Sequence, residues 1–123
     1  MKQRSLAALG LALLAGCASI SDKPPALADN GILVDQKRMT LYTYDNDKTQ
    51  GKSSCNGQCA VNWPPFMMAE GAMSAGEFSV VLRDDGKKQW AYKGQPLYYW
   101  PEDQEPGDRY GDNVGNVCHV VSP

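Results

Sequence analysis

Four cysteines and a single histidine are the residues of this chain best suited to redox chemistry or metal binding. Cys55 and Cys59 are separated by three residues, and on a helical turn this spacing can bring two Cα atoms within the ~4.4–6.8 Å that a disulfide allows. Redox pairs of the thioredoxin type use two intervening residues instead. In an exported protein, spaced cysteines usually form a structural bridge. We therefore predict a Cys55–Cys59 disulfide, which leaves Cys118 without a partner.

Copper binding is the main alternative use of these residues. Cys118 and His119 are adjacent, and Met67 and Met68 supply soft thioether sulfurs of the kind that Cu(I) prefers. Neighbouring residues on a strand point to opposite faces, so Cys118 and His119 would not readily bind one ion together. The chain also has no second histidine. We expect no resident cofactor and keep a copper or redox-handling role as the weaker hypothesis.

Catalysis has little support in the sequence. The chain has no G-x-S-x-G nucleophile motif, no phosphate-binding loop and no dinucleotide-binding fingerprint. A Ser-His-Asp triad would have to centre on His119, and no serine stands in a recognisable nucleophile context. We therefore predict that the protein is not an enzyme.

An aromatic motif occurs twice in the chain, with its two copies 56 positions apart. Each copy reads Leu-Tyr-x-aromatic-x-x-Asp, and the repeated positions are Tyr42, Tyr44 and Asp47 in the first copy and Tyr98, Trp100 and Asp103 in the second. On a strand, the two aromatic residues of one copy share a face. They could line a groove for a ligand, or they could form the core while the aspartates accept backbone hydrogen bonds in turns. We favour the core.

The N-terminus carries an export signal. Basic residues precede an apolar run at residues 6–16, which is shorter than the roughly 20 residues that a membrane-spanning helix needs. The run ends in Leu-Ala-Gly-Cys at residues 14–17, which resembles the lipobox of bacterial lipoproteins. This resemblance implies cleavage before Cys17, which leaves a diacylated N-terminal cysteine, and two or more acyl chains hold a protein stably at a membrane. In a Gram-negative host, Ala18 after the cysteine implies the periplasmic face of the outer membrane.

The charge of the chain limits the kinds of partner that it can bind, and its composition indicates where the folded domain begins. Without Lys2 and Arg4 of the predicted signal peptide (residues 1–16), ten basic and fourteen acidic side chains remain, a net charge near −4. No basic patch stands out, which disfavours nucleic-acid binding. Residues 17–30 lack hydrophobic periodicity and contain serine and proline, as expected for a lipidated end and a flexible tether. We expect the membrane, through the lipid, and an envelope protein or small ligand as partners.

Short strands must position these motifs. Strand signals cover residues 31–35, 39–44, 77–83, 89–92, 97–100 and 115–121. Asp85-Gly86 is a strong hairpin signal, because glycine accepts the positive φ that the turn requires. One short helical turn is expected over residues 57–63, because the following prolines cannot continue it. We predict a mainly β fold in which residues 31–123 form one small antiparallel domain, built from two related strand–turn units with little helix.

Several motifs in one order resemble a known family. They are the two aromatic motifs, the cysteine segment at residues 52–60, Trp63-Pro64-Pro65 and Pro106-Gly107-Asp108. Together they resemble bacterial predicted lipoproteins with a Yx(FWY)xxD motif, also called secreted repeats of unknown function, over residues 32–121. The resemblance implies an exported protein and carries no agreed activity. We therefore expect a lipid-anchored envelope protein that acts as a non-enzymatic binding or structural module. The chain departs from the family pattern at Cys118 and His119.

Overall fold

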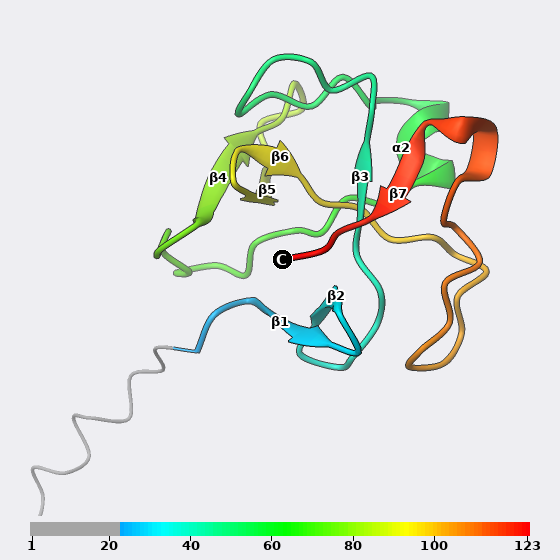
Figure 1. Ribbon diagram of the computed structural model, residues 1–123. Helices are drawn as coiled ribbons and strands as arrows, with labels where there is room; N and C mark the ends of the chain where they lie inside the picture. The colour runs from blue at the N-terminus through cyan, green and yellow to red at the C-terminus, as the bar shows by residue number, and fades with distance from the viewer. Residues whose placement is uncertain (1–22) are drawn as a thin grey trace, which may run out of the picture.

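The described part of the chain contains three small antiparallel sheets. The computed structural model describes residues 23–123, so the predicted signal peptide (1–16) and the lipidation site Cys17 lie outside the described residues. One sheet pairs β1 (Ala26–Asp29) with β2 (Ile32–Asp35), and a second pairs β3 (Tyr42–Tyr44) with β7 (Cys118–Val120). The third contains β4 (Phe78–Leu82), β5 (Lys88–Tyr92) and β6 (Gln95–Pro96) in that order (Figure 1). The predicted mainly β fold is confirmed.

Helix is limited to two short segments within residues 23–123. They are α2 (Gln58–Asn62) and the 3-10 turn η2 (Val114–Asn116). α2 agrees with the helical turn expected over residues 57–63. It ends at Asn62 and has Trp63 as its C-cap, just before the two prolines that cannot extend it. No helix in the described residues is long and apolar enough to span a bilayer.

Glycine-containing turns close the β1–β2 and β4–β5 hairpins. At the β1–β2 turn, Asn30 and Gly31 both have positive φ, 52° and 83°, as a type I′ turn requires. At the β4–β5 turn, Gly86 has a φ of 84°, and the Arg83 N–H donates to the Lys87 carbonyl at 2.8 Å. The hairpin predicted at Asp85-Gly86 is therefore confirmed.

The predicted tether ends earlier than expected. Residues 26–29, which fall inside the predicted tether at 17–30, form β1 and pair with β2 along its whole length. Ala26 is buried and packs with Leu33 in the core. The Asn-Gly turn that follows β1 accounts for this difference, because it folds the segment back onto β2.

The segments expected as strands at 97–100 and 115–121 differ most from the structure. The first is not a strand: β6 ends at Pro96, and Tyr98 instead makes isolated bridges to Tyr42 and Pro65. The strand expected at 115–121 begins only at Cys118, because Gly115 and Asn116 adopt left-handed φ values of 62° and 61° and belong to η2.

The core has two clusters, and each copy of the repeat contributes to both. Leu41 and Leu97 lie in the first cluster, which also contains Ala26, Leu33 and Trp90. Tyr42 and Tyr98 lie in the second, which also contains Cys55, Trp63 and Cys118. Adjacent residues on extended backbone point to opposite sides. The repeated Leu-Tyr pair therefore divides its two side chains between the two clusters.

Candidate functional site

The two copies of the aromatic motif meet at Tyr42 and Tyr98. The backbone N–H of each tyrosine donates to the carbonyl of the other, and both distances are 2.9 Å. The two residues form an antiparallel bridge, and both side chains are fully buried. Two residues that exchange both backbone hydrogen bonds in an antiparallel pair are related by a local two-fold axis. This pair is therefore the point about which the two copies are arranged.

Each tyrosine hydroxyl also binds the aspartate of the other copy. Tyr42 Oη donates to Asp103 Oδ2 at 2.5 Å, and Tyr98 Oη donates to Asp47 Oδ2 at 2.6 Å. Burial, together with the hydrogen bond to the carboxylate, raises the pKa of each tyrosine well above its usual range. Both hydroxyls therefore remain protonated donors, and the two copies are joined by two reciprocal buried hydrogen bonds.

The second oxygen of each aspartate binds backbone in its own loop. Asp47 Oδ1 accepts from the Ser54 N–H at 2.7 Å, and Asp103 Oδ1 accepts from the Tyr110 N–H at 2.8 Å. The turn-tying role expected for the aspartates is thus only half of what they do. The sequence does not predict the exchange between copies, because it does not specify how two segments 56 residues apart are paired.

The hydroxyl of Tyr42 receives a backbone donor. The Gly111 N–H donates to Tyr42 Oη at 3.1 Å. A Cβ on Gly111 would lie 2.7 Å from the Trp100 side chain and 2.8 Å from the Tyr42 ring. Only glycine lets the backbone approach this closely without displacing an aromatic ring.

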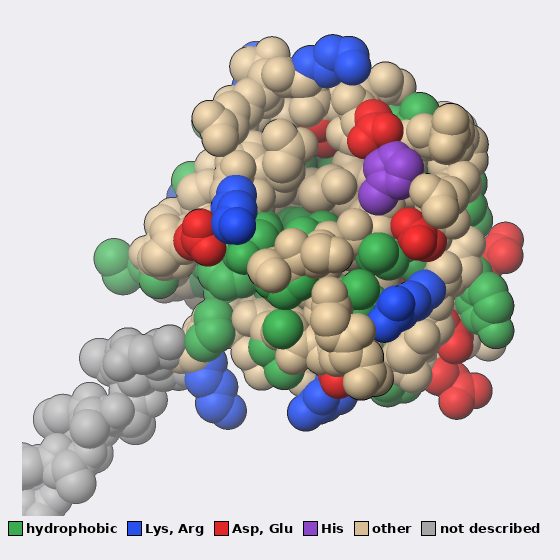
Figure 2. Space-filling model, viewed as in Figure 1, with side chains coloured by type: hydrophobic (Ala, Val, Ile, Leu, Met, Phe, Trp, Pro, Cys, Tyr) green, Lys and Arg blue, Asp and Glu red, His purple; other side chains and the backbone are tan. Residues whose placement is uncertain are grey.

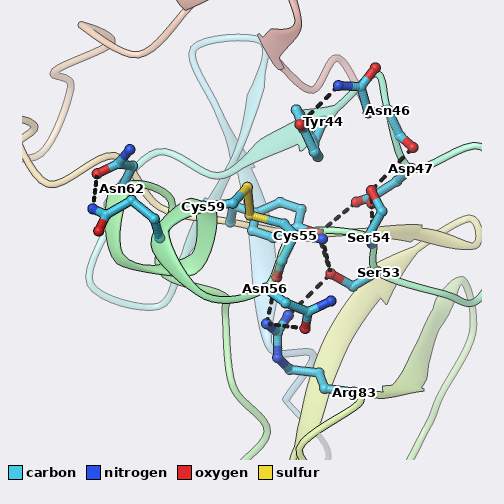
Figure 3. The surroundings of a disulfide bond; sticks show 12 residues. Tyr44, Asn46, Asp47, Ser53, Ser54, Cys55, Asn56, Cys59, Asn62 and Arg83 are labelled. Atoms are coloured by element: carbon cyan, nitrogen blue, oxygen red, sulfur yellow. Dashed lines mark hydrogen bonds between the residues drawn. A yellow bond between two sulfur atoms is a disulfide. The ribbon is translucent and has the colours of Figure 1, made fainter.

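A buried arginine supports the hydroxyl of Tyr98. Arg83, which is 5% exposed, directly follows β4 and donates to Ser53 Oγ at 3.2 Å and to the Cys55 carbonyl at 2.6 Å (Figure 3). Ser53 Oγ lies 2.7 Å from Tyr98 Oη. Because arginine can only donate and an ionised carboxylate can only accept, the hydroxyl protons run from Ser53 to Tyr98 and from Tyr98 to Asp47.

This relay connects a buried positive charge to a buried negative one. Within residues 23–123, no carboxylate lies within salt-bridge distance of Arg83. Its other strong contact is the Gln89 side-chain oxygen at 2.7 Å. The two neutral hydroxyls therefore connect the guanidinium to Asp47. The sequence indicated no role for Arg83, which had only the appearance of a strand end.

The disulfide closes a short loop that begins two residues after Ser53. Cys55 and Cys59 are bonded in the structure, with their Cα atoms 5.2 Å apart, and Figure 3 shows the bridge joining α2 to the segment that carries Ser53 and Ser54. Cys118 is the free cysteine of the described residues and lies buried in the same core cluster as Cys55. Burial, with smaller contributions from Asp45 and Asp47, raises the pKa of the Cys118 thiol to about 12. Since the thiolate is the nucleophile and metal ligand, Cys118 is inert in this state.

The four candidate copper ligands are not assembled into one site. Cys118 faces the second core cluster, whereas Met68 packs against the first and Met67 bridges to Gln89. His119 lies on the other face of β7, with Nε2 2.8 Å from Asp45 Oδ2 and Nδ1 3.0 Å from Asn113 Oδ1. Figure 2 shows the histidine side chain at the surface, next to acidic side chains. In the part of the chain that the structure describes, no three His, Cys, Asp or Glu side chains converge to hold a metal ion.

An open pocket lies beside the second aromatic residue of the second motif. The rings of Trp63 and Trp100 are 4.4 Å apart between centroids and tilted by 35°. They line a cavity of about 360 Å³, whose other lining residues are Val61, Asn62, Pro101, Glu102 and Val114. In the first copy, Tyr44 instead packs edge-on against Tyr98 at 6.2 Å. Tyr42 and Tyr98 are thus core residues, Tyr44 is partly buried against them, and Trp100 is the motif aromatic that borders this pocket.

Comparison with known proteins gives a family. The sequence profile of the secreted repeat of unknown function matches residues 26–67 and 79–122. The chain belongs to this family. The first matched segment carries Tyr42 and Asp47 and the second carries Tyr98 and Asp103, so the secreted repeats are the two units that exchange hydrogen bonds. No curated protein and no solved structure is significantly similar to this secreted-repeat protein.

Removing either motif hydroxyl should destabilise the secreted-repeat protein. Tyr42→Phe removes the hydroxyl that the Gly111 N–H and Asp103 Oδ2 both bind. Tyr98→Phe removes the hydroxyl that Ser53 Oγ and Asp47 Oδ2 both bind. A buried polar group left unsatisfied costs about 1–3 kcal/mol. We expect each variant to lose stability in this range in urea denaturation. Tyr110→Phe, at an exposed tyrosine, is the matched control and should differ from the wild type by under about 0.5 kcal/mol. A loss of stability under about 0.5 kcal/mol in the two buried variants would contradict the exchange.

Asp103 should make stability depend on pH. Burial raises the pKa of Asp103, although the hydrogen bonds from Tyr42 and Tyr110 oppose this shift. Between the unfolded pKa of about 3.9 and this higher folded pKa, the folded state binds more protons, so the Asp103 contribution to stability rises as pH falls. We expect the free energy of unfolding of the wild type, relative to Asp103→Asn, to increase from pH 7 to pH 4. A relative stability that is flat or decreases over this range would show that the pKa is not raised.

Proposed function

We propose that this protein is a non-enzymatic binding module of the bacterial cell envelope, held at the membrane by a lipid on Cys17. Membership of a secreted-repeat family supports export. The Leu-Ala-Gly-Cys sequence at residues 14–17 supports the anchor, because the lipobox directs acylation of its cysteine. Two or more acyl chains hold a protein stably at a bilayer, whereas a single chain binds only marginally.

The observation that carries the non-enzymatic part of the proposal is how the reactive side chains are used. The hydroxyls of Tyr42 and Tyr98 are buried and bonded to Asp103 and Asp47. Cys118 is buried, and the pKa of its thiol is raised. A general base or nucleophile must reach its substrate. These groups instead maintain the fold, and binding at the surface is the function that the geometry supports best.

The pocket bordered by Trp63 and Trp100 is the binding site that we propose. Its volume of about 360 Å³ falls within the ~300–1,000 Å³ typical of small-molecule sites. The aromatic rings offer flat apolar surface, and the side chains of Asn62 and Glu102 offer hydrogen-bond acceptors at the rim. This combination fits a ligand that has a ring with one apolar face and carries hydroxyl or amine donors on its edge. The ring can be a small molecule or part of an envelope partner.

Filling the pocket from outside should abolish binding without disturbing the core. Val61 is exposed on α2 and lines the pocket, so Val61→Trp can occupy it. We expect ring-containing fragments, screened by NMR at millimolar concentration, to shift the indole N–H signals of Trp63 and Trp100 and not that of Trp90. Val61→Trp should remove these shifts, whereas Met73→Trp, at an exposed loop residue outside the pocket lining, should preserve them. No binding fragment, or binding that Val61→Trp leaves intact, would refute this site.

The anchor has its own test. In the native host, metabolic labelling with an alkynyl fatty acid should mark the wild type, and the labelled protein should fractionate with membranes. We expect Cys17→Ser to abolish the label and to leave an uncleaved or soluble precursor. Cys118→Ala is the matched cysteine control and should keep the label. A Cys17→Ser protein that is still mature, acylated and membrane-bound would overturn the lipid-anchor proposal.

A further inference from the structure

β4 is an open edge of the three-stranded sheet. The strand order is β4-β5-β6, and Figure 1 places β4 at the periphery of the molecule. The far side of β5 is occupied: the Trp90 N–H donates to the Phe66 carbonyl, and the Lys88 carbonyl accepts from the Met68 N–H. Since the backbone groups of Trp90 and Lys88 point away from β4, these two residues belong to the non-hydrogen-bonded pairs of the β4–β5 ladder.

This register determines which backbone groups of β4 face outward. Val80 pairs with Trp90 and Leu82 pairs with Lys88, so the N–H and C=O of Val80 and Leu82 point away from β5. Phe78 lies two residues before Val80, so its N–H and C=O also point outward, and both form hydrogen bonds with Ala75. The open edge therefore presents two donors and two acceptors, at Val80 and Leu82.

The side chains along this edge are apolar and exposed. Val80 is 41% exposed and Leu82 is 64% exposed. Natural open edges are usually protected from pairing by a lysine, a proline, a bulge or an inward-pointing charge. The stretch from Ser79 to Leu82 contains no charged residue and no proline. An edge of this kind is suited to pairing with another strand.

We propose that this edge pairs with β4 of a second copy of the chain, antiparallel and centred on Val81. In this register Val80 of one copy lies opposite Leu82 of the other, and the two pairs exchange four backbone hydrogen bonds. The four exposed apolar side chains then lie together on one face. The combined sheet has six strands, three from each copy.

The neighbouring registers are less favourable, which is why the centre falls on Val81. A pairing centred on Val80 would need the outward groups of Phe78, which Ala75 already uses. A pairing centred on Leu82 would place Val80 opposite Asp84 and set a carboxylate against apolar side chains. With Val81 at the centre, every outward group that pairs is free and its side chain is apolar. β4 is thus complementary to itself.

The contact is small, and we therefore expect a weak pair. Four hydrogen bonds and four side chains fall well short of the ~1,600 Å² that a standard stable interface buries. Copies confined to a membrane meet at a higher effective concentration than copies in solution. The pairing does not depend on the proposed pocket, because none of the pocket-lining residues belongs to β4.

Cysteine cross-linking of the full-length protein in cells tests the register. Val80→Cys and Leu82→Cys chains with different tags are co-expressed, and membranes are analysed under non-reducing conditions. Directly opposed residues of a hydrogen-bonded pair have Cα atoms about 5.5 Å apart, within disulfide range, whereas diagonal neighbours are about 7–8 Å apart. We expect the mixed Val80→Cys with Leu82→Cys dimer to exceed either same-residue dimer by at least about tenfold.

The control and the contrary outcomes are specific to this pairing. Met73→Cys is more exposed than either edge position and lies outside β4, so its mixture with Leu82→Cys should give no comparable dimer. Equal cross-linking in all combinations would indicate random collision and overturn the proposal. Absence of the mixed dimer, with both chains present and folded by their melting temperatures, would overturn it as well. Neither result bears on fragment binding at the Trp63–Trp100 pocket.

Discussion

Two buried tyrosine–aspartate hydrogen bonds, each joining one copy of the repeat to the other, constrain the rest of this structure. Neither copy can satisfy its own pair, because Tyr42 needs Asp103 and Tyr98 needs Asp47. A buried hydroxyl or carboxylate without a partner costs about 1–3 kcal/mol, a large fraction of the stability of a small domain. The two copies are therefore parts of one folding unit, although the sequence shows them as separate segments.

The copies share this exchange and differ in what supports it. Tyr42 receives its donor from the backbone of Gly111, whereas Tyr98 receives its donor from Ser53, which Arg83 and the disulfide loop hold in place. The same hydroxyl geometry is thus reached by two different loops. A duplicated unit can retain the pair that joins its halves while its loops diverge. The pocket beside Trp100 lies next to one of these loops, whereas Tyr44, the corresponding residue of the first copy, packs against Tyr98.

Much of the fold was predictable because its determinants are local. Strand alternation, the Asp85-Gly86 turn, the helical turn before the prolines and the close spacing of Cys55 and Cys59 each depend on a few neighbouring residues. The failures that bear on the candidate site involve distant contacts. The segment after β6 looks like a strand, yet Tyr98 bridges Tyr42 and Pro65 instead of continuing the sheet. Arg83 could not be recognised, because its partners are contributed by the disulfide loop and β5.

Both surfaces that we propose for binding are connected to the tyrosine–aspartate exchange through ring contacts or hydrogen bonds. Trp63 packs edge-on against the Tyr42 ring at 5.5 Å, so one wall of the pocket is fixed by the tyrosine that bonds Asp103. β4 continues into Arg83, whose contact with Ser53 leads to Tyr98 and Asp47. A rigid wall lowers the entropy lost when a ligand binds, and a strand fixed at its end presents its edge in one register. The polar groups that the fold has buried therefore hold in place the two surfaces that we propose for recognition.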